Sequence, residues 1–145
     1  MEEREVTYHV LTAKNAPTLR GADVFDKAVD PDMLSAFVSD TGHEMIFAAT
    51  GADVIGFASG NVLLHPDKPP AFFVSEVGVE AAWRRQGIAT ALVDRLIRLA
   101  RDRGCRGIWL ATETDNVAAR ALYRRLAARE TGAVVVYDWD GAMDE

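Results

Sequence analysis

The chain has 145 residues, a length that suits one domain built around one hydrophobic core, and we take residues 1–145 as a single domain. Hydrophobic residues make up 49% of the sequence, which is too large a share for a disordered chain. The formal net charge of −6 argues against general binding of nucleic acid, which needs a basic face, and it permits a cationic partner.

The sequence also bears on localisation and on metal binding. No apolar run approaches the roughly 18 to 20 residues that span a bilayer, and the charged start MEEREVTYHV is not a signal peptide, so we expect no membrane partner. The single cysteine, Cys105, cannot form an internal disulfide, which favours the reducing cytoplasm and a structural thiol. His9, His43 and His65 lie far apart without the spacing of metal ligands, so we predict no metal.

The first part of the chain predicts one strand and two helical segments. VTYHVL at 6–11 is an expected strand, and residues 15–27 have a weak helical pattern. Asp30 fits an N-cap with Pro31 at the first helical position. A short helix should therefore run from there to about Ser39.

The middle of the chain predicts three strands. EMIFAAT (44–50) and DVIGFASGNVLL (53–64) flank a Gly-Ala pair, which is typical of a hairpin. The prolines of HPDKPP (65–70) interrupt the pattern, because proline cannot donate a ladder hydrogen bond. AFFVSEVGV (71–79) resumes it as the third strand.

The strongest helical signal follows Gly87. Apolar residues recur there at spacings of four, four and three, at Ile88, Leu92, Leu96 and Leu99. Asp94, Arg98 and Asp102 lie four apart on the opposite face, where they can pair. Gly104 provides a C-terminal stop for this helix.

The last third of the chain predicts two strands around one more helix. GIWLAT (107–112) is a strand, NVAARALYRRLAA (116–128) is a helix capped by Asp115 or Asn116, and AVVVYDW (133–139) is a final strand. The resulting order is β-α-α-β-β-β-α-β-α-β. It predicts an α/β or α+β fold whose mixed sheet is antiparallel through the hairpins and parallel where helices cross over.

Two arginines and a glycine, in RRQGIA, stand between the strand predicted at 71–79 and the long helix. The chain has neither a GxxxxGK[ST] P-loop nor a GxGxxG turn. However, the free N–H groups at a helix start bind anions with the help of the helix dipole. Gly87 permits close backbone approach, and Arg84 and Arg85 add charge. The segment predicts a seat for a pyrophosphate; the alternative is a solvated surface turn.

Arg84-x-x-Gly87-x-Ala89 resembles the R/Q-x-x-G-x-G/A pyrophosphate loop of the GNAT N-acetyltransferase superfamily. It follows a strand ending in EVGV and precedes a long amphipathic helix, as that family requires. NVAARALY (116–123) resembles the family stretch N-x-x-A-x-x-L-Y on the helix after the next strand. The resemblance covers nearly the whole chain. It implies a GNAT-like, mostly antiparallel central sheet flanked by helices, and acetyl transfer from acetyl-CoA to an amine.

Two features depart from that family. LAA at 126–128 stands where relatives usually have a sequence near Leu-Gly-Phe, and one predicted strand follows the last helix where many relatives have two. The missing strand either leaves a wider acceptor cleft or is replaced by a partner subunit, so a homodimer is one expectation. The short tail and WRRQGIATALVDRL most resemble the small aminoglycoside 3-N-acetyltransferases, which implies a role in antibiotic resistance.

The resemblance assigns acetyl-CoA to two adjoining segments. The pyrophosphate is expected at backbone N–H groups of Gln86, Gly87, Ile88, Ala89 and Thr90, with Arg84 and Arg85 assisting. The pantetheine is expected along EVGV, where Val77 and Val79 supply backbone groups and Gly78 leaves room. A routine core strand is the alternative there. Asn116 matches the motif asparagine, and it bonds the pantetheine, caps the helix, or does both.

Two residues are candidates for proton transfer. Glu76 is a carboxylate in an otherwise apolar or small-residue strand, where a buried charge is costly unless it is paired or used. The resemblance implies a base acting directly or through water; the alternative is a side chain on a solvated face. Tyr123 falls at the motif tyrosine, and its phenol would protonate the coenzyme A thiolate. The alternative for Tyr123 is a packed aromatic with a hydrogen-bonded tip.

Acidic residues are expected to line the path of the amine, at Glu113, Asp115, Asp138 and Asp140. A polycationic aminoglycoside would suit such a rim, as would a polyamine or a lysine-bearing peptide, and a solvated acidic tail is the alternative. The leading hypothesis is an acetyl-CoA-dependent N-acetyltransferase, with an aminoglycoside 3-amino group as a candidate acceptor. The alternatives are transfer to a protein, peptide or small metabolite amine, and a catalytically silent acyl-CoA-binding domain.

Overall fold

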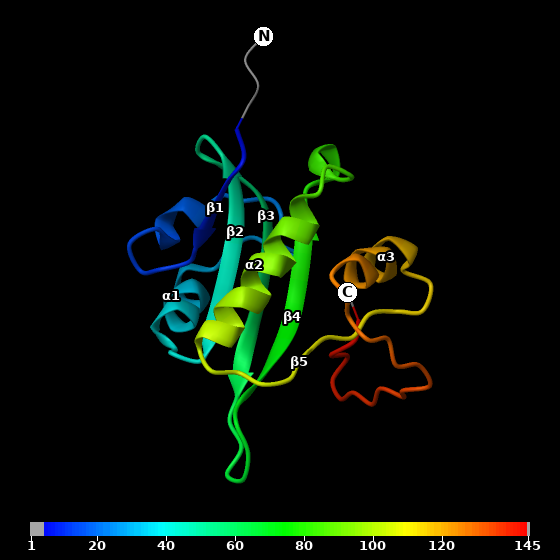
Figure 1. The fold of residues 1–145 in the computed structure, drawn as a ribbon. Coiled ribbons are helices and arrows are strands. Elements are labelled where there is room, and N and C mark those ends of the chain that lie inside the picture. Colours follow the sequence, from blue (N-terminus) through cyan, green and yellow to red (C-terminus); the bar gives the residue numbers. More distant parts are fainter. Residues whose placement is uncertain (1–4, 145) are drawn as a thin grey trace. The chain divides into compact units, whose positions relative to one another are not determined.

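The structure is a computed structural model that describes residues 5–144, and the charged start of the chain, residues 1–4, lies outside that range. The chain divides into two compact units, Met1–Ala111 and Thr112–Glu145. The first unit holds the sheet and two helices, and the second holds the last helix (Figure 1).

A five-stranded sheet in the order β1-β2-β3-β4-β5 is the framework of the first unit. The strands are β1 (Thr7–Val10), β2 (His43–Thr50), β3 (Asp53–Leu63), β4 (Ala71–Val79) and β5 (Ile108–Trp109). The first four pair in antiparallel fashion, and β5 joins β4 in parallel through two residue pairs. The predicted fold class, a mixed and mostly antiparallel sheet with flanking helices, is confirmed.

The helix boundaries follow from capping residues that the sequence marks. In α1 (Pro31–Ser39), the side chain of Asp30 accepts hydrogen bonds from the backbone N–H groups of Asp32 and Met33, as predicted for an N-cap. The long helix α2 (Ile88–Asp102) ends just before Gly104, whose φ is +83°. The last helix, α3 (Val117–Arg125), begins after Asn116.

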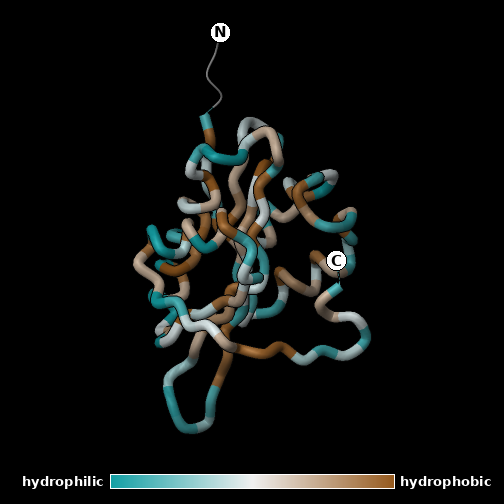
Figure 2. The backbone as a smooth tube through the Cα atoms, turned by 90° about the vertical axis from the view of Figure 1, so that its right-hand side faces the viewer, coloured by the Kyte–Doolittle hydropathy of each residue, from teal (hydrophilic) through white to brown (hydrophobic). Residues whose placement is uncertain are grey.

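Within the first unit, different elements pack against the two faces of the sheet. Helix α2 lies across one face (Figure 1), where Leu92 and Leu96 are fully buried. A Cβ atom on Gly56 would sit 3.1 Å from Cδ1 of Leu92, so glycine lets the helix lie close to β3. Figure 2 shows apolar stretches along the strands and hydrophilic stretches at turns.

The opposite face carries a core cluster formed by Leu19, Met45, Phe47, Ala49, Val54 and Phe57. Helix α1 contributes Leu34 and Phe37 to it. Burial of each large side chain of this kind contributes about 1.5 to 3 kcal/mol. This cluster therefore anchors α1 and the segment before it on the face of the sheet that α2 does not cover.

Three expected elements differ from the structure. The helix predicted over 15–27 is wrong beyond one 3₁₀ turn, η1 (Ala16–Leu19); Gly21 then adopts a φ of +76°, and the rest runs irregularly over the core. The strand predicted at 107–112 shortens to Ile108–Trp109: Gly107 has a φ of +85°, and the ladder with β4 includes only these two residues of the segment. The final strand predicted at 133–139 is wrong.

The segment 133–139 illustrates how β-branched residues need a partner strand. In the described part of the chain, none of the strands pairs with it. Its apolar side chains are exposed, with 72% for Val134 and 80% for Tyr137. Valine favours strands chiefly by packing against neighbours on a sheet, so an unpaired valine run has little reason to be regular.

Candidate active site

A β-bulge interrupts β4 near its middle. Val74 lies opposite Gly60 and Glu76 lies opposite Ser59, so Ser75 is an extra residue in β4. The hydroxyl of Ser75 donates a hydrogen bond to the backbone oxygen of Ser59 at 3.3 Å. A bulge re-aims the side chains that follow it. As a result, Glu76 shares a face with Ser59, on the side of the sheet away from α2.

Glu76 is exposed and makes no hydrogen bond or ion pair with the described residues. Partial burial raises the pKa of its carboxyl above the ordinary value, and the negative charge of Asp26 raises it further. The backbone oxygen of Val24 lies 3.3 Å from where a Cβ on Gly78 would sit, so the segment 24–26 runs over this face of β4. Glu76 is therefore open to solvent on this face of the sheet, beside an acidic neighbour that the local sequence did not indicate.

The outer edge of β4 is open beyond its first residues. Strand β5 pairs only with Phe72 and Phe73, and no other described strand takes the outer edge of β4. The N–H of Glu80 bonds to β3, at 2.9 Å from the oxygen of Ile55. Because successive residues of a strand direct their backbone groups to alternate sides, Val79 and Val77 direct theirs to the open edge.

Arg84 contacts that open edge directly. Its Nε donates a hydrogen bond to the backbone oxygen of Val79 at 3.1 Å. The guanidinium thereby ties the end of β4 to the loop that follows the 3₁₀ turn η2 (Ala81–Trp83). The predicted pantetheine strand and the predicted pyrophosphate loop are thus adjacent in the fold.

The loop before α2 has the backbone shape expected of an anion site. Arg85 and Gly87 both have positive φ, of 64° and 78°, and residues 84–87 are exposed. The first helical hydrogen bond runs from the N–H of Ala91 to the oxygen of Gly87 at 3.0 Å. Among the described residues, the N–H groups of 86–90 have no protein acceptor. These donors, two arginines and the helix dipole together suit a pyrophosphate.

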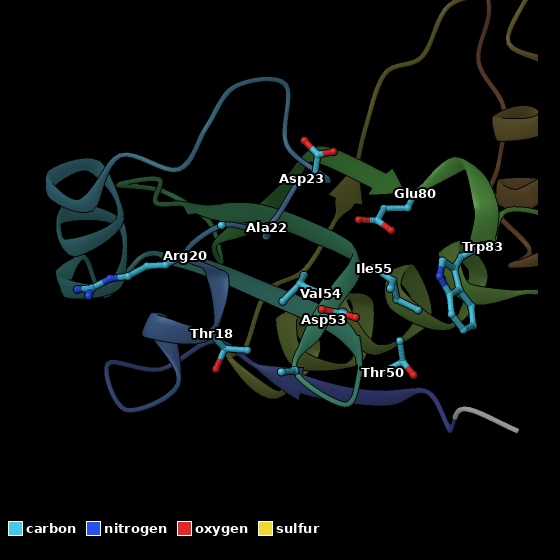
Figure 3. A pocket seen from close by; sticks show the side chains of 12 residues that line it. Thr18, Arg20, Ala22, Asp23, Thr50, Asp53, Val54, Ile55, Glu80 and Trp83 are labelled. Atoms are coloured by element: carbon cyan, nitrogen blue, oxygen red, sulfur yellow. The ribbon is translucent and has the colours of Figure 1, made fainter. Parts of the chain in front are cut away.

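One cavity lies beside this loop, and the predicted site residues are not among the residues that line it. It measures about 370 Å³, and Figure 3 shows its lining. The lining residues are Thr18, Arg20, Gly21, Ala22, Asp23, Thr50, Ala52, Asp53, Val54, Ile55, Glu80 and Trp83. This lining has three carboxylates and one guanidinium, so it suits a cation better than a phosphate.

In the second unit, Tyr123 belongs to α3, and Asn116 is the residue just before this helix. Tyr123 is half-buried, and burial raises the pKa of its phenol, so the group stays protonated at neutral pH. The side chain of Asn116 accepts a hydrogen bond from the N–H of Ala119 at 3.1 Å. Asn116 rather than Asp115 is therefore the cap of α3. Helix capping was one of the two roles expected for Asn116, the other being a contact to the pantetheine.

The acidic residues predicted for the acceptor are exposed and belong to the second unit, at Glu113, Asp115, Asp138 and Asp140. A different acid, Glu130, forms ion pairs with Arg120 and Arg124 of α3 at 3.1 Å and 3.0 Å. These two guanidinium groups lower the pKa of Glu130 to about 2. Its pairing depends on the turn after α3, so the linear sequence gave no signal for it.

The sequence profile of the Acetyltransferase (GNAT) family matches residues 11–128, which include the loop, the open strand edge and α3. The chain belongs to this family.

Several relatives of this GNAT chain are acetyltransferases. The L-2,4-diaminobutyric acid acetyltransferase of Streptomyces coelicolor is 37% identical over 91 residues, covering 57% of this chain and 52% of the relative. N-acetyltransferase 8B of Rattus norvegicus is 30% identical over 105 residues, covering 70% of this chain and 46% of the relative. The GNAT chain thus spans about half the length of the curated relatives it matches.

Solved structures share the fold of this GNAT chain. An aminoglycoside acetyltransferase from an uncultured soil metagenomic sample, in complex with sisomicin, has a TM-score of 0.77 at 16% identity, over 93% of this chain and 97% of that one. Aminoglycoside N-acetyltransferase AAC(6')-Iy, in complex with CoA, has a TM-score of 0.77 at 18% identity, over 96% and 97%. At these identities the likeness shows the fold.

Other predictions concern cofactor chemistry and localisation. Cys105 is 4% exposed, and burial raises the pKa of its thiol, which fits a structural cysteine. Between residues 5 and 144, we find no group of three or more His, Cys, Asp or Glu side chains arranged to hold a metal. Within the same range, every helix is too short or too polar to cross a membrane.

Proposed function

We propose that this GNAT chain is an N-acetyltransferase that moves an acetyl group from acetyl-CoA to a primary amine on a cationic acceptor. The observation that carries this proposal is the open edge of β4, which runs from the bulge beside Glu76 to the loop at 84–87. We also propose that the two units work as one acetyltransferase domain, since the family match at 11–128 spans both.

The residues along the open edge fit acetyl-CoA. The N–H groups of 86–90 and the charges of Arg84 and Arg85 would hold the pyrophosphate. Backbone groups of Val77 and Val79 would pair with the pantetheine amides, and Gly78 has no side chain that would obstruct the approach of the ligand. When bound, acetyl-CoA supplies an activated acetyl group as a thioester, whose carbonyl a backbone N–H near Val77 would polarise.

Glu76 is proposed as the base. An acceptor amine is protonated in water and must lose a proton before it attacks. The Glu76 carboxylate is free of protein partners among the described residues, and its raised pKa makes it a better proton acceptor than an ordinary glutamate. It takes the proton at its Oε atoms, directly or through a water.

Tyr123 is proposed as the acid, with Asn116 as a further contact to the pantetheine. The raised pKa keeps the phenol of Tyr123 protonated, so that its Oη can donate a proton to the departing sulfur. The Asn116 oxygen caps α3, which leaves the amide N–H₂ of the same side chain to donate to a ligand.

The acceptor is proposed to carry more than one amine. The relatives that act on L-2,4-diaminobutyric acid favour a small diamino acid, and the aminoglycoside acetyltransferases that share the fold favour an aminoglycoside. For an aminoglycoside we keep the 3-amino group as the proposed point of attack, and the chain would then be a cytoplasmic antibiotic-resistance enzyme. Glu113, Asp115, Asp138 and Asp140 would attract either acceptor, and a homodimer would complete the sheet edge.

The acetyl-CoA seat is tested by calorimetric titration of the wild type and of Arg84→Glu. Loss of one charge-assisted contact and reversal of charge should weaken binding at least about tenfold. Arg106→Glu is the control, since Arg106 is exposed in the same unit and lies outside the loop. Equal affinity of the Arg84 and Arg106 variants would refute the placement of the pyrophosphate.

The acceptor is tested by kcat/KM for a panel of amines, with mass spectrometry of the products. The panel contains gentamicin, L-2,4-diaminobutyrate, a lysine-bearing peptide and a neutral-bodied monoamine. We expect gentamicin or the diamino acid to exceed the monoamine by at least about tenfold, as one favourable ionic contact would give. A preference for the peptide would refute the small-molecule assignment and leave acetyl transfer standing.

A further inference from the structure

An exposed aromatic pair stands at the junction of β4 and β5. Trp109 lies beside Phe73 in the parallel ladder, and the two ring centroids are 4.5 Å apart with an interplanar angle of 42°. Trp109 is 52% exposed even though it belongs to a strand of the central sheet. A large aromatic ring held in place by a neighbour and open to solvent is suited to contact a ligand.

The strand register puts this aromatic pair on the same face as Glu76. Phe73 lies opposite Asn61 and Glu76 lies opposite Ser59, two residues apart on β3. Alternate residues of a strand share a face and are about 7 Å apart. Because of the bulge, Phe73 and Glu76 therefore both face away from α2, and Trp109 joins them as the ladder partner of Phe73.

The groups beside the aromatic pair are polar and negative. Asp26 lies close enough to Glu76 for its negative charge to act on the Glu76 carboxyl. Ser59 is 4% exposed, and in the part of the chain that the structure describes no protein group bonds its hydroxyl. A neutral apolar partner would leave these groups without hydrogen bonds, whereas an ammonium would bond them.

We propose that Trp109, supported by Phe73, determines specificity by holding a second cationic centre of the acceptor while the reacting amine lies at Glu76. This inference rests on the proposed acetyl transfer and deepens it. A cation over an aromatic face is attracted by the ring quadrupole, and tryptophan gives the strongest contact. No cation of the chain takes that position among the described residues, whereas Arg95 lies over the ring of Tyr8 at 4.2 Å.

The occupant is a small molecule with two ammonium groups. Its charge complements the two neighbouring acids, Glu76 and Asp26, and the net charge of −6 favours its approach. One ammonium would stay charged over Trp109, and the other would lose its proton to Glu76. Trp109 is the ladder partner of Phe73, and Phe73 lies about 7 Å from Glu76 along β4, so a flexible chain of about five carbons between the two ammonium groups fits this spacing.

The test compares 1,5-diaminopentane with 1-aminopentane, which differ by one ammonium group. The wild type should have the higher kcat/KM with the diamine. Trp109→Ala should raise KM for the diamine by about tenfold, with little change for the monoamine, and Trp109→Phe should fall between. The control is Met33→Ala, because Met33 is a large apolar residue that is 74% exposed on α1.

The outcomes separate this inference from the proposed function. A selective loss of kcat/KM for the diamine in Trp109→Ala, with unchanged acetyl-CoA affinity and unfolding temperature, supports the proposed cation site at Trp109. Equal losses for both amines, no loss in either Trp109 variant, or no diamine preference in the wild type would overturn it while acetyl transfer stands. Absence of thiol release with every amine would overturn both proposals.

Discussion

Glu76 is the residue on which the proposed chemistry depends most. Substitution by glutamine keeps the shape of the side chain and removes the base. General base catalysis is typically worth about 10² to 10⁴ in rate, so kcat of Glu76→Gln should fall by that factor. The acetyl-CoA dissociation constant should stay within about twofold, because the loop at 84–90 is unchanged. Steady-state kinetics and calorimetry on the same preparation measure the two quantities, and near-normal turnover would place the base elsewhere.

The pH dependence of the same residue gives a second readout. A base must be deprotonated, so kcat/KM should rise with pH through the pKa of Glu76. Burial and the charge of Asp26 raise that pKa, so kcat/KM should rise at a pH above the ordinary pKa of glutamate. Asp26→Asn should move this rise toward lower pH. If the rise of kcat/KM with pH is the same in the wild type, Glu76→Gln and Asp26→Asn, a group other than Glu76 titrates.

Tyr123 is predicted to act at a later step than Glu76. Because burial raises the pKa of its phenol, Tyr123→Phe removes an acid that is protonated over the whole neutral range. We expect kcat to fall by about 10² or more, with a smaller change in acetyl-CoA affinity, as measured by single-turnover kinetics. Unchanged rates with every acceptor would make Tyr123 a packing residue.

Residue-level interpretation from the sequence succeeded where the signal was local. The cap at Asp30 and the helix stop at Gly104 are fixed by neighbours within a few positions. The electrostatic effect of Asp26 on Glu76 and the ring contact of Phe73 with Trp109 join residues far apart along the chain. Local patterns contain no information on such pairs, which is why the sequence missed them.

At the scale of elements, the two ends of α2 offer a matched comparison. Gly87 and Gly104 have φ of +78° and +83°, and a Cβ at either would meet no atom within 4 Å. Alanine at either position should cost about 1 to 2 kcal/mol of unfolding free energy, because it disfavours the left-handed region. Only Gly87→Ala should also weaken acetyl-CoA binding, because only this glycine belongs to the loop.

Chemical denaturation and calorimetry on both variants test this comparison. Equal loss of acetyl-CoA affinity in Gly87→Ala and Gly104→Ala would mean that the effect comes from destabilising α2. Such a result would not support the loop at 84–90 as the pyrophosphate site. A loss confined to Gly87→Ala is the expected result.

The elements themselves were predictable to different degrees. Strands β2 to β4 and helix α2 have strong periodic patterns and appear within one or two residues of their predicted ends. The bulge at Ser75 was not predictable, because the pattern of AFFVSEVGV does not show which residue lacks a partner. The valine run at 133–139 has the composition of a strand, but strand formation depends on an available edge elsewhere in the fold.

At the scale of the whole molecule, the net charge of −6 predicts a salt-dependent acceptor affinity. Screening shortens the reach of the field to about 10 Å at 0.1 M salt, so KM for a polycationic acceptor should rise with salt. Changing Asp138 and Asp140 together to asparagine should raise KM at low salt and flatten the salt dependence. Kinetics at two salt concentrations measure this, and indifference to both changes would remove these residues from the acceptor path.

The central claim is that the chain catalyses acetyl transfer to an amine and does more than bind an acyl-CoA. The most direct measurement is the initial rate of thiol release from saturating acetyl-CoA, with and without a multi-amine acceptor. We predict release that saturates with acceptor concentration, together with an equal amount of acetylated amine by mass spectrometry. Binding of acetyl-CoA without any amine-dependent release, across the whole panel of acceptors, would contradict the claim and identify a silent acyl-CoA-binding domain.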